Sequence, residues 1–182
     1  ITAAISMAAA DIDLIMVPIQ MYSGTNSVVL LAIPLFIFMG ELMAATSISE
    51  RIINLASSMV GWMRGGLGHI NVMTSMFMAE MSGSAVADAA VMSKVFVPQM
   101  ERKGFPKEFA AAVTATSATL GIIIPPSIPM VLYGVTTNQS IKDLFIAGIV
   151  PGILLGSAFM LVIYIFARKE NHPVDAAFRL TY

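Results

Sequence analysis

The sequence contains no cysteine, only one tryptophan and two histidines, and few charged residues. The lack of cysteine excludes disulfide bonds and thiolate metal sites. Charged residues make up 12% of the chain, against about 25% in an ordinary soluble domain. With a net charge of −1, no basic surface favours nucleic acid as a partner. Instead, 57% of the 182 residues are hydrophobic and the mean hydropathy is +0.83, which predicts an integral membrane protein or a piece of one.

The chain starts with isoleucine inside an apolar run, and no signal peptide is recognisable there. We therefore expect a fragment of a longer membrane protein. Asp11, Asp13 and Pro18 argue against a clean membrane span in the first 21 residues, and the polar residues 22–27 predict a turn. Residues 1–27 are interpreted as a truncated N-terminal segment and turn, and residues 171–182 as a tail.

Residues 28–67 are expected to combine two kinds of helix. Residues 28–45 are apolar and nearly as long as a transmembrane helix, which needs roughly 20 residues. A second helix should start with Ser47 or Ser49 as its N-cap. Its apolar positions are Ile52, Ala56, Met59, Val60 and Met63. Ser57 falls on the opposite, polar side, so the pattern predicts an amphipathic helix that lies along the membrane interface.

Residues 68–140 carry two interruptions in otherwise apolar sequence. The first is Ser82-Gly83-Ser84, inside the apolar stretch 69–100. Two complete membrane crossings need about 40 residues. This shorter stretch therefore predicts a re-entrant helical hairpin with its tip at 82–84, followed by a charged surface loop at 101–108.

The second interruption runs from Gly121 to Ser127. Pro125 and Pro126 remove two backbone donors, and a proline clashes with the carbonyl four residues before it. The residue before a proline is also pushed out of the helical region. A helix that arrives from Glu108 should therefore stop near Gly121 and restart near Ser127. In hydrocarbon, such a break persists only where protein or a water-filled cavity satisfies its backbone.

Residues 141–170 predict the last membrane segment. We expect a short helix at 141–149, an interruption at Pro151 and Gly152, and a membrane helix at 153–167 that ends at Arg168. With a re-entrant hairpin, most basic residues fall on one side of the membrane. The positive-inside rule predicts that this side is cytoplasmic.

The hairpin tip and the helix break offer oxygen atoms at membrane depth. Serine hydroxyls and freed backbone carbonyls suit a hard cation such as sodium, since softer metals prefer nitrogen and sulfur ligands. Helix ends that point at the break also favour an anionic substrate. The alternative is that Ser, Thr and Gly simply allow close helix packing in lipid.

Three further residues are candidates for lining the substrate site or a cavity. Placing the charged carboxylate of Asp88 at the membrane centre costs a few kcal/mol of free energy unless it is paired or hydrated. It either faces the tip or stabilises the first turn of the second hairpin limb. Ser117 and Thr119 line the limb that enters the break. An enzyme with a tip serine as nucleophile is not expected, because the only candidate base, His69, lies at the far end of the limb.

Several ordered motifs resemble the large membrane subunit of tripartite ATP-independent periplasmic (TRAP) transporters, the DctM-like family. The motifs are residues 82–90 (Ser-Gly-Ser-Ala-Val-Ala-Asp-Ala-Ala), 123–134 (Ile-Ile-Pro-Pro-Ser-Ile-Pro-Met-Val-Leu-Tyr-Gly), 33–36 (Ile-Pro-Leu-Phe), 64–67 (Arg-Gly-Gly-Leu) and 145–152 (Phe-Ile-Ala-Gly-Ile-Val-Pro-Gly). The resemblance covers about residues 22–169 and corresponds to the first half of such a subunit. It implies an all-α membrane protein that forms half of an inverted-repeat elevator transporter.

The resemblance also implies function. The family takes up organic acids, such as C4-dicarboxylates or sialic acid, in a sodium-coupled manner in the bacterial inner membrane. Its partners are a small membrane subunit and a periplasmic substrate-binding protein, and it uses no cofactor besides the coupling ion. The implied sodium ligands are Ser82, Gly83, Ser84, Gly121, Pro125, Pro126 and Ser127. Glu80 and Lys94 depart from the small residues expected there, which leaves the substrate open.

Two alternatives remain beside this interpretation. One is a self-sufficient sodium/carboxylate symporter of related architecture, which needs no accessory subunit. The other is a membrane scaffold without transport activity, in which the tip and the break would be dry.

Overall fold

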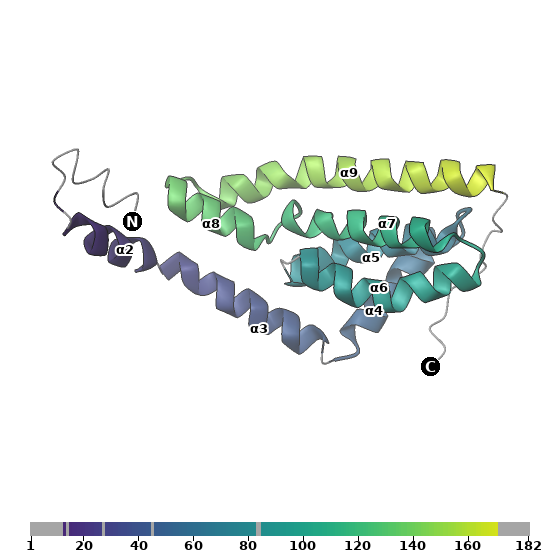
Figure 1. Ribbon diagram of the computed structural model, residues 1–182, viewed down its shortest axis with the longest axis horizontal. Helices are drawn as coiled ribbons and strands as arrows, with labels where there is room; N and C mark the ends of the chain where they lie inside the picture. The colour runs from purple at the N-terminus through teal and green to yellow at the C-terminus, as the bar shows by residue number, and fades with distance from the viewer. Residues whose placement is uncertain (1–12, 14, 27, 45, 83–84, 171–182) are drawn as a thin grey trace.

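The computed structural model describes residues 13, 15–26, 28–44, 46–82 and 85–170, and these ranges form helices joined by short connections (Figure 1). The elements are α2 (Met16–Thr25), the 3₁₀ helix η1 (Val28–Leu31), α3 (Ala32–Ala44), α4 (Ile48–Val60), α5 (Gly66–Ser82), α6 (Ala85–Arg102), α7 (Lys107–Ala118), the 3₁₀ helix η2 (Thr119–Ile122), α8 (Ile128–Thr137) and α9 (Ile141–Lys169). The predicted all-α class is confirmed over these ranges.

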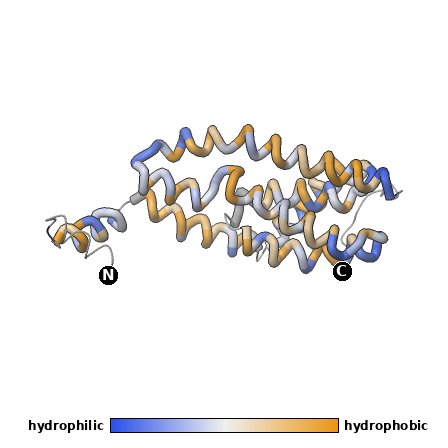
Figure 2. Tube along the Cα trace, turned by 45° about the horizontal axis from the view of Figure 1, so that its top comes forward, coloured by the Kyte–Doolittle hydropathy of each residue, from blue (hydrophilic) through white to orange (hydrophobic). Residues whose placement is uncertain are grey.

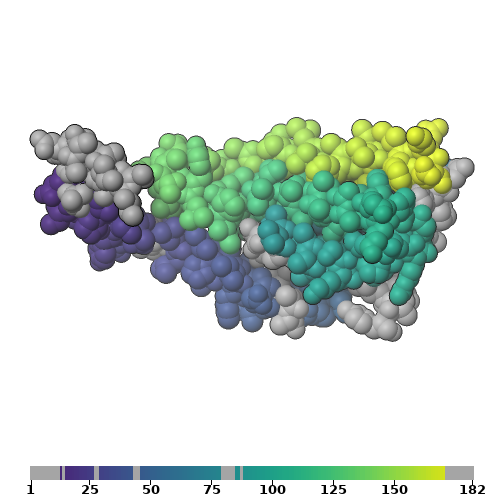
Figure 3. Space-filling model, in the orientation of Figure 1, coloured from purple at the N-terminus to yellow at the C-terminus, as the bar shows by residue number. Residues whose placement is uncertain are grey.

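The core lies where α5 is surrounded by α4, α6, α7 and α9. One buried cluster centres on Ile70, Phe96 and Met100, and a second joins Leu120 to Ile163 of α9. In Figure 3, α9 lies along α7 and α8 for most of its length. The 3₁₀ helix η2, which lies between α7 and α8, contacts α5, α6 and α9.

The N-terminal turn expected at 22–27 is wrong for Tyr22 to Thr25, which belong to α2. The Thr25 hydroxyl donates to the Met21 carbonyl oxygen at 2.9 Å, so this polar residue is accommodated inside the helix. The helix ends at Thr25, and the N–H of the C-cap residue Asn26 donates to the Tyr22 carbonyl oxygen. Asp11 and Ser27 lie outside the described residues.

The predicted amphipathic helix is present as α4, but its buried face is rotated from the expected one. Ala56, Ser57 and Val60 are buried, whereas Met59 is 46% exposed. Small side chains at this contact let α4 approach α5 closely, and the longer Met59 is left outside. Ser57, expected on the polar side, therefore lies on the buried face of α4.

The helix expected to be interrupted at Pro151 is continuous, because α9 runs without a break through 29 residues. Pro151 removes one backbone donor, and it lies on an exposed side of the helix. The parts of α9 before and after Pro151 pack through Gly148, Gly152 and Gly156, which are buried. Among the described residues, α9 is the one single helix long and apolar enough to cross a membrane. Figure 2 shows its apolar middle between polar ends.

The helices α5 and α6 are longer than the hairpin limbs of the sequence analysis. They contain 17 and 18 residues, respectively. At 1.5 Å per residue each is about 26 Å long, close to the hydrocarbon core of about 30 Å. They gain this length because α5 already starts at Gly66 and α6 continues to Arg102. Re-entry of the hairpin stays a prediction.

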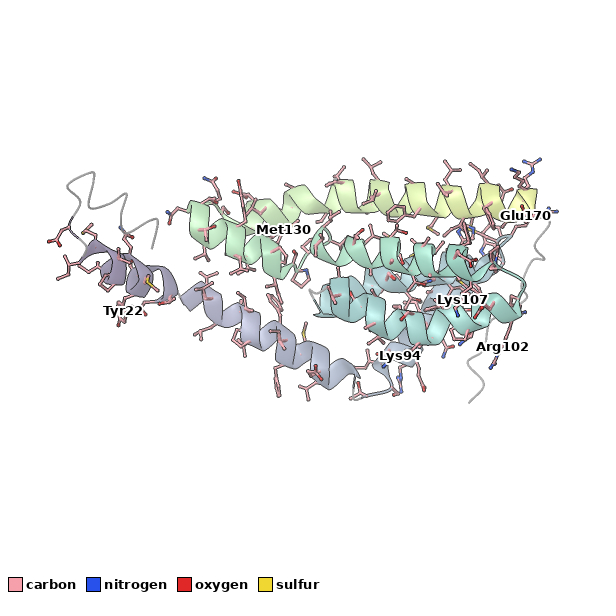
Figure 4. All side chains as sticks on the ribbon, in the orientation of Figure 1. Tyr22, Lys94, Arg102, Lys107, Met130 and Glu170 are labelled. Carbon is pink, nitrogen blue, oxygen red and sulfur yellow. The ribbon has the colours of Figure 1, made fainter. Side chains whose placement is uncertain are left out.

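Basic residues gather at one end of the molecule. Figure 4 places Arg102 and Lys107 at the same end as Glu170, which follows Lys169 at the end of α9. Gly65, next to Arg64, packs against Ala167 there. Lys142 begins α9 at the opposite end. For these residues the grouping of positive charge agrees with the prediction.

Candidate functional site

The helix that arrives from Lys107 stops and restarts as the sequence predicts. The regular α7 ends at Ala118 and tightens into η2, which ends at Ile122, and α8 starts at Ile128. The carbonyl oxygen of Leu120 accepts the N–H groups of both Ile123 and Ile124, at 3.0 and 2.8 Å. The peptide bond between Pro125 and Pro126 is cis. Residues 123–127 thus form a short non-helical segment in the middle of the helix pair, termed the break below.

Ser127 is the last residue of the break and directly precedes α8. Its side chain is fully buried, and its hydroxyl donates to the Ile122 carbonyl oxygen at 2.9 Å. The Ser127 hydroxyl oxygen in turn accepts the Met130 N–H at 3.5 Å, so Ser127 is the N-cap of α8. Gly121 is buried, and Pro125 and Pro126 are partly buried. The four predicted ligands from this segment therefore lie together.

Two side-chain hydrogen bonds join α5 to α7 below the break. Asn71 Nδ2 donates to Thr114 Oγ1 at 2.7 Å, and Ser75 Oγ donates to Ser117 Oγ at 3.2 Å. All four residues are buried. Ser117, predicted to line a cavity, thus takes part in a helix–helix contact in this structure.

The sequence analysis missed Asn71 and Ser75, although they carry a recognisable signal. Polar residues at positions 71, 74 and 75 share one helical face inside an apolar stretch. Such residues in a membrane helix commonly hydrogen-bond to a neighbouring helix. This spacing therefore predicts a polar contact between α5 and a neighbouring helix.

The hairpin tip lies largely outside the described residues. This holds for Gly83 and Ser84, and for the side chain of Ser82, whose backbone ends α5. The described helix η2 contacts both α5 and α6. Figure 1 shows the ends of α5 and α6 that flank the tip at the level of the break. The described ends of α5 and α6 therefore lie at the same level of the fold as the break.

The remaining candidates differ in burial. Asp88 lies in the first turn of α6 and is only 3% exposed. This position fits a carboxylate that stabilises a helix N-terminus, and its burial agrees with a place inside the fold. Thr119 is exposed, and its hydroxyl donates to the Thr116 carbonyl oxygen at 2.6 Å. The hydroxyl of Thr119 is therefore used within its own helix.

A cavity of about 660 Å³ lies away from the break, between α2 and the turn that joins α8 to α9. Its polar lining comes from Gln20, Ser23, Thr136, Asn138 and Gln139. None of the predicted site residues lines it. The break is therefore the stronger candidate for the functional site.

Comparison with known proteins identifies the family. The family model "Tripartite ATP-independent periplasmic transporter, DctM component" matches residues 1–181. The sialic acid TRAP transporter large permease protein SiaM of Vibrio cholerae is 42% identical over 153 residues, which cover 84% of this chain and 36% of the relative. The 2,3-diketo-L-gulonate TRAP transporter large permease protein YiaN of Escherichia coli is 43% identical over 83% of this chain and 36% of its own length.

A third relative is the C4-dicarboxylate TRAP transporter large permease protein DctM of Pseudomonas aeruginosa, 42% identical over 85% of this chain and 36% of the relative. The chain thus spans about a third of the length of the curated relatives it matches. The predicted resemblance is confirmed: the chain belongs to the DctM component family of tripartite ATP-independent periplasmic transporters, a family of membrane permeases and not of enzymes.

Proposed function

We propose that this chain forms part of the large membrane subunit of a sodium-coupled secondary transporter that imports an organic acid across the bacterial inner membrane. A periplasmic binding protein delivers the substrate, and a small membrane subunit completes the transporter. The hairpin and the break move together as part of an elevator-type transport domain. The relatives named above are described as permeases for sialic acid, 2,3-diketo-L-gulonate and C4-dicarboxylate. A carboxylate is the chemical group that these substrates share.

The observation that carries the proposal is the interruption between α7 and α8, whose 3₁₀ helix η2 packs against α5 and α6, in a chain of this family. A helix that stops in the middle of an apolar segment leaves carbonyl oxygens without helical partners. In transporters with discontinuous helices, such carbonyls coordinate sodium while helix N-termini face anionic substrate groups. Ser127 begins α8 at this point, so the N-terminal end of α8 faces the break.

Sodium is proposed to lie between the tip and the break. The candidate ligands are Ser82, Gly83, Ser84, Gly121, Pro125, Pro126 and Ser127. Hydroxyl and carbonyl oxygens are hard ligands and suit an alkali cation. The Ser127 hydroxyl proton is directed to the Ile122 carbonyl oxygen, so its oxygen retains acceptor capacity for a cation.

Uptake into proteoliposomes tests the proposal. A permease of full family length that carries this chain would be reconstituted with its small subunit, and labelled C4-dicarboxylate and sialic acid would be offered with the binding protein. We expect uptake that requires both an inward sodium gradient and the binding protein. Ser84→Ala is expected to raise the half-saturating sodium concentration. Thr116→Ala is the matched control, because the Thr116 hydroxyl is exposed and bonded within its own helix.

The alternatives predict different results in the same assay. A self-sufficient symporter would take up substrate without a binding protein. A scaffold would show no uptake, and cysteines introduced at residues 83 and 126 would resist water-soluble thiol reagents. Uptake that needs neither sodium nor a binding protein would contradict the proposed function.

A further inference from the structure

Three glycines on α9 face the interior at intervals of four residues. Gly148, Gly152 and Gly156 are all buried, although α9 also presents many exposed apolar side chains. Residues four apart lie on one face of a helix. The structure shows what each glycine touches, and the three contacts differ in kind.

Gly148 lies against backbone of the break. A methyl group added there would be 2.5 Å from the Ile123 carbonyl oxygen and 2.6 Å from Met130 Cε. Met130 lies on α8 alongside α9 (Figure 4). The backbone of α9 therefore covers the Ile123 carbonyl at a distance that no residue with a side chain allows.

The next two glycines meet side chains. A methyl group at Gly152 would be 2.5 Å from Cγ1 of Ile124, a β-branched residue of the break with few rotamers. At Gly156 it would be 2.6 Å from Sδ of Met76, whose long side chain can move aside. Resistance to an added methyl group thus falls from Gly148 to Gly152 to Gly156.

Three carbonyl groups in or next to the break, those of Leu120, Ile122 and Ile123, are bonded or covered. The Leu120 oxygen accepts two N–H groups, and the Ile122 oxygen accepts the Ser127 hydroxyl. The Ile123 oxygen is covered by Gly148. The break is thereby closed toward α9 at Ile123 and Ile124.

We infer that Gly148 and Gly152 are positioning residues that fix the cation-binding geometry of the break, with α9 acting as its supporting wall. This inference rests on the proposed sodium-coupled function. It assigns to α9 a role in sodium affinity, although α9 supplies no ligand. If α9 were displaced by an added methyl group, Ile123 and Ile124 would shift, and with them the adjacent carbonyls of the site.

The test compares single glycine-to-alanine variants in the full-length, reconstituted permease with its small subunit and binding protein. Gly148→Ala should raise the half-saturating sodium concentration by about tenfold, Gly152→Ala by a smaller factor, and Gly156→Ala by less than about twofold. Gly24→Ala is the control, because nothing lies within 4 Å of a methyl group there. Size-exclusion profiles and the maximal uptake rate monitor folding separately from sodium affinity.

Second substitutions distinguish positioning from general damage. Ile124→Ala removes the atom that meets Gly152→Ala, so the double variant should recover much of its sodium affinity. Met130→Ala should not rescue Gly148→Ala, because the Ile123 carbonyl oxygen remains. If Gly148→Ala does not fold, the inference is tested by whether Ile124→Ala restores the sodium affinity of Gly152→Ala.

The outcomes separate this inference from the proposed function. Sodium-dependent uptake by the unaltered permease, with equal sodium affinity in folded Gly148→Ala and Gly156→Ala, would overturn the inference alone. A Gly152→Ala defect that Ile124→Ala does not relieve would also overturn it. Uptake by the unaltered permease that does not depend on sodium would overturn the proposed function, and this inference with it.

Discussion

The segment from Gly121 to Ser127 and the segment around Pro151 both contain glycine and proline, yet the helix stops in the first and continues in the second. A single interior proline costs about 3 kcal/mol, mainly through one lost hydrogen bond and a clash with the preceding turn. In α9 long apolar flanks offset that cost, and Pro151 lies on an exposed side. One proline in a well-packed helix is therefore tolerated.

The first segment differs in three ways. Pro125 and Pro126 are consecutive, so each also restricts the residue before it. The buried Ser127 provides a new N-cap, and the break is bonded internally through Leu120 and Ile122. In this chain the helix stops where Ser127 provides a restart and the freed carbonyls have partners, whereas α9 continues through Pro151.

The largest expected effect comes from removing the prolines. Pro125→Ala with Pro126→Ala should favour a continuous helix and withdraw carbonyl oxygens from the break, lowering sodium-dependent uptake by more than about tenfold. Pro151→Ala should leave uptake within about twofold and raise the melting temperature, since it restores a donor in α9. Sodium-dependent uptake is measured in proteoliposomes, and the melting temperature is measured by thermal unfolding in detergent. Equal loss of uptake in both variants would remove the distinction between the regions.

An intermediate effect is expected from the two serine N-caps. Ser127→Ala removes two hydrogen bonds from a buried position and should cost about 1–3 kcal/mol, with a raised half-saturating sodium concentration. Ser140→Ala removes the exposed cap of α9, which accepts the Asp143 N–H at 3.3 Å, and should cost about 0.5–1 kcal/mol without a change in sodium affinity. Unfolding curves and sodium titrations report both quantities. Unchanged stability in Ser127→Ala would show that the cap does not hold the break.

The smallest effect concerns the hydrogen bonds between α5 and α7. Thr114→Val leaves the buried Asn71 amide without this partner and should destabilise the fold by about 1 kcal/mol. Adding Asn71→Leu should recover most of the loss, because replacing both partners by apolar groups is nearly neutral. Thr116→Val, at an exposed position, serves as the control and should change stability by less than about 0.5 kcal/mol. A double-mutant cycle with no coupling would contradict a role for this bond in joining the two helices.

Local backbone chemistry predicted much of this fold. Consecutive prolines restrict the backbone conformation, which predicted the break and the restart of the helix at Ser127. Periodic hydrophobicity predicted that α4 is a helix. The orientation of α4 was not predictable in this way, since the polar Ser57 is buried while the apolar Met59 is exposed. Continuity through Pro151 was likewise missed, because it depends on contacts of α9 with distant residues.

By itself the sequence determined the helical, membrane-type character of the chain, its family and the position of the break, since these follow from composition, ordered motifs and the geometry of proline. Only the tertiary structure decided that α9 closes one side of the break and that Asn71 and Ser75 join α5 to α7. The physical reason is that close packing and interhelical hydrogen bonds depend on residues far apart in sequence. Because a glycine has no side chain, its presence in the sequence does not indicate which element will pack against it.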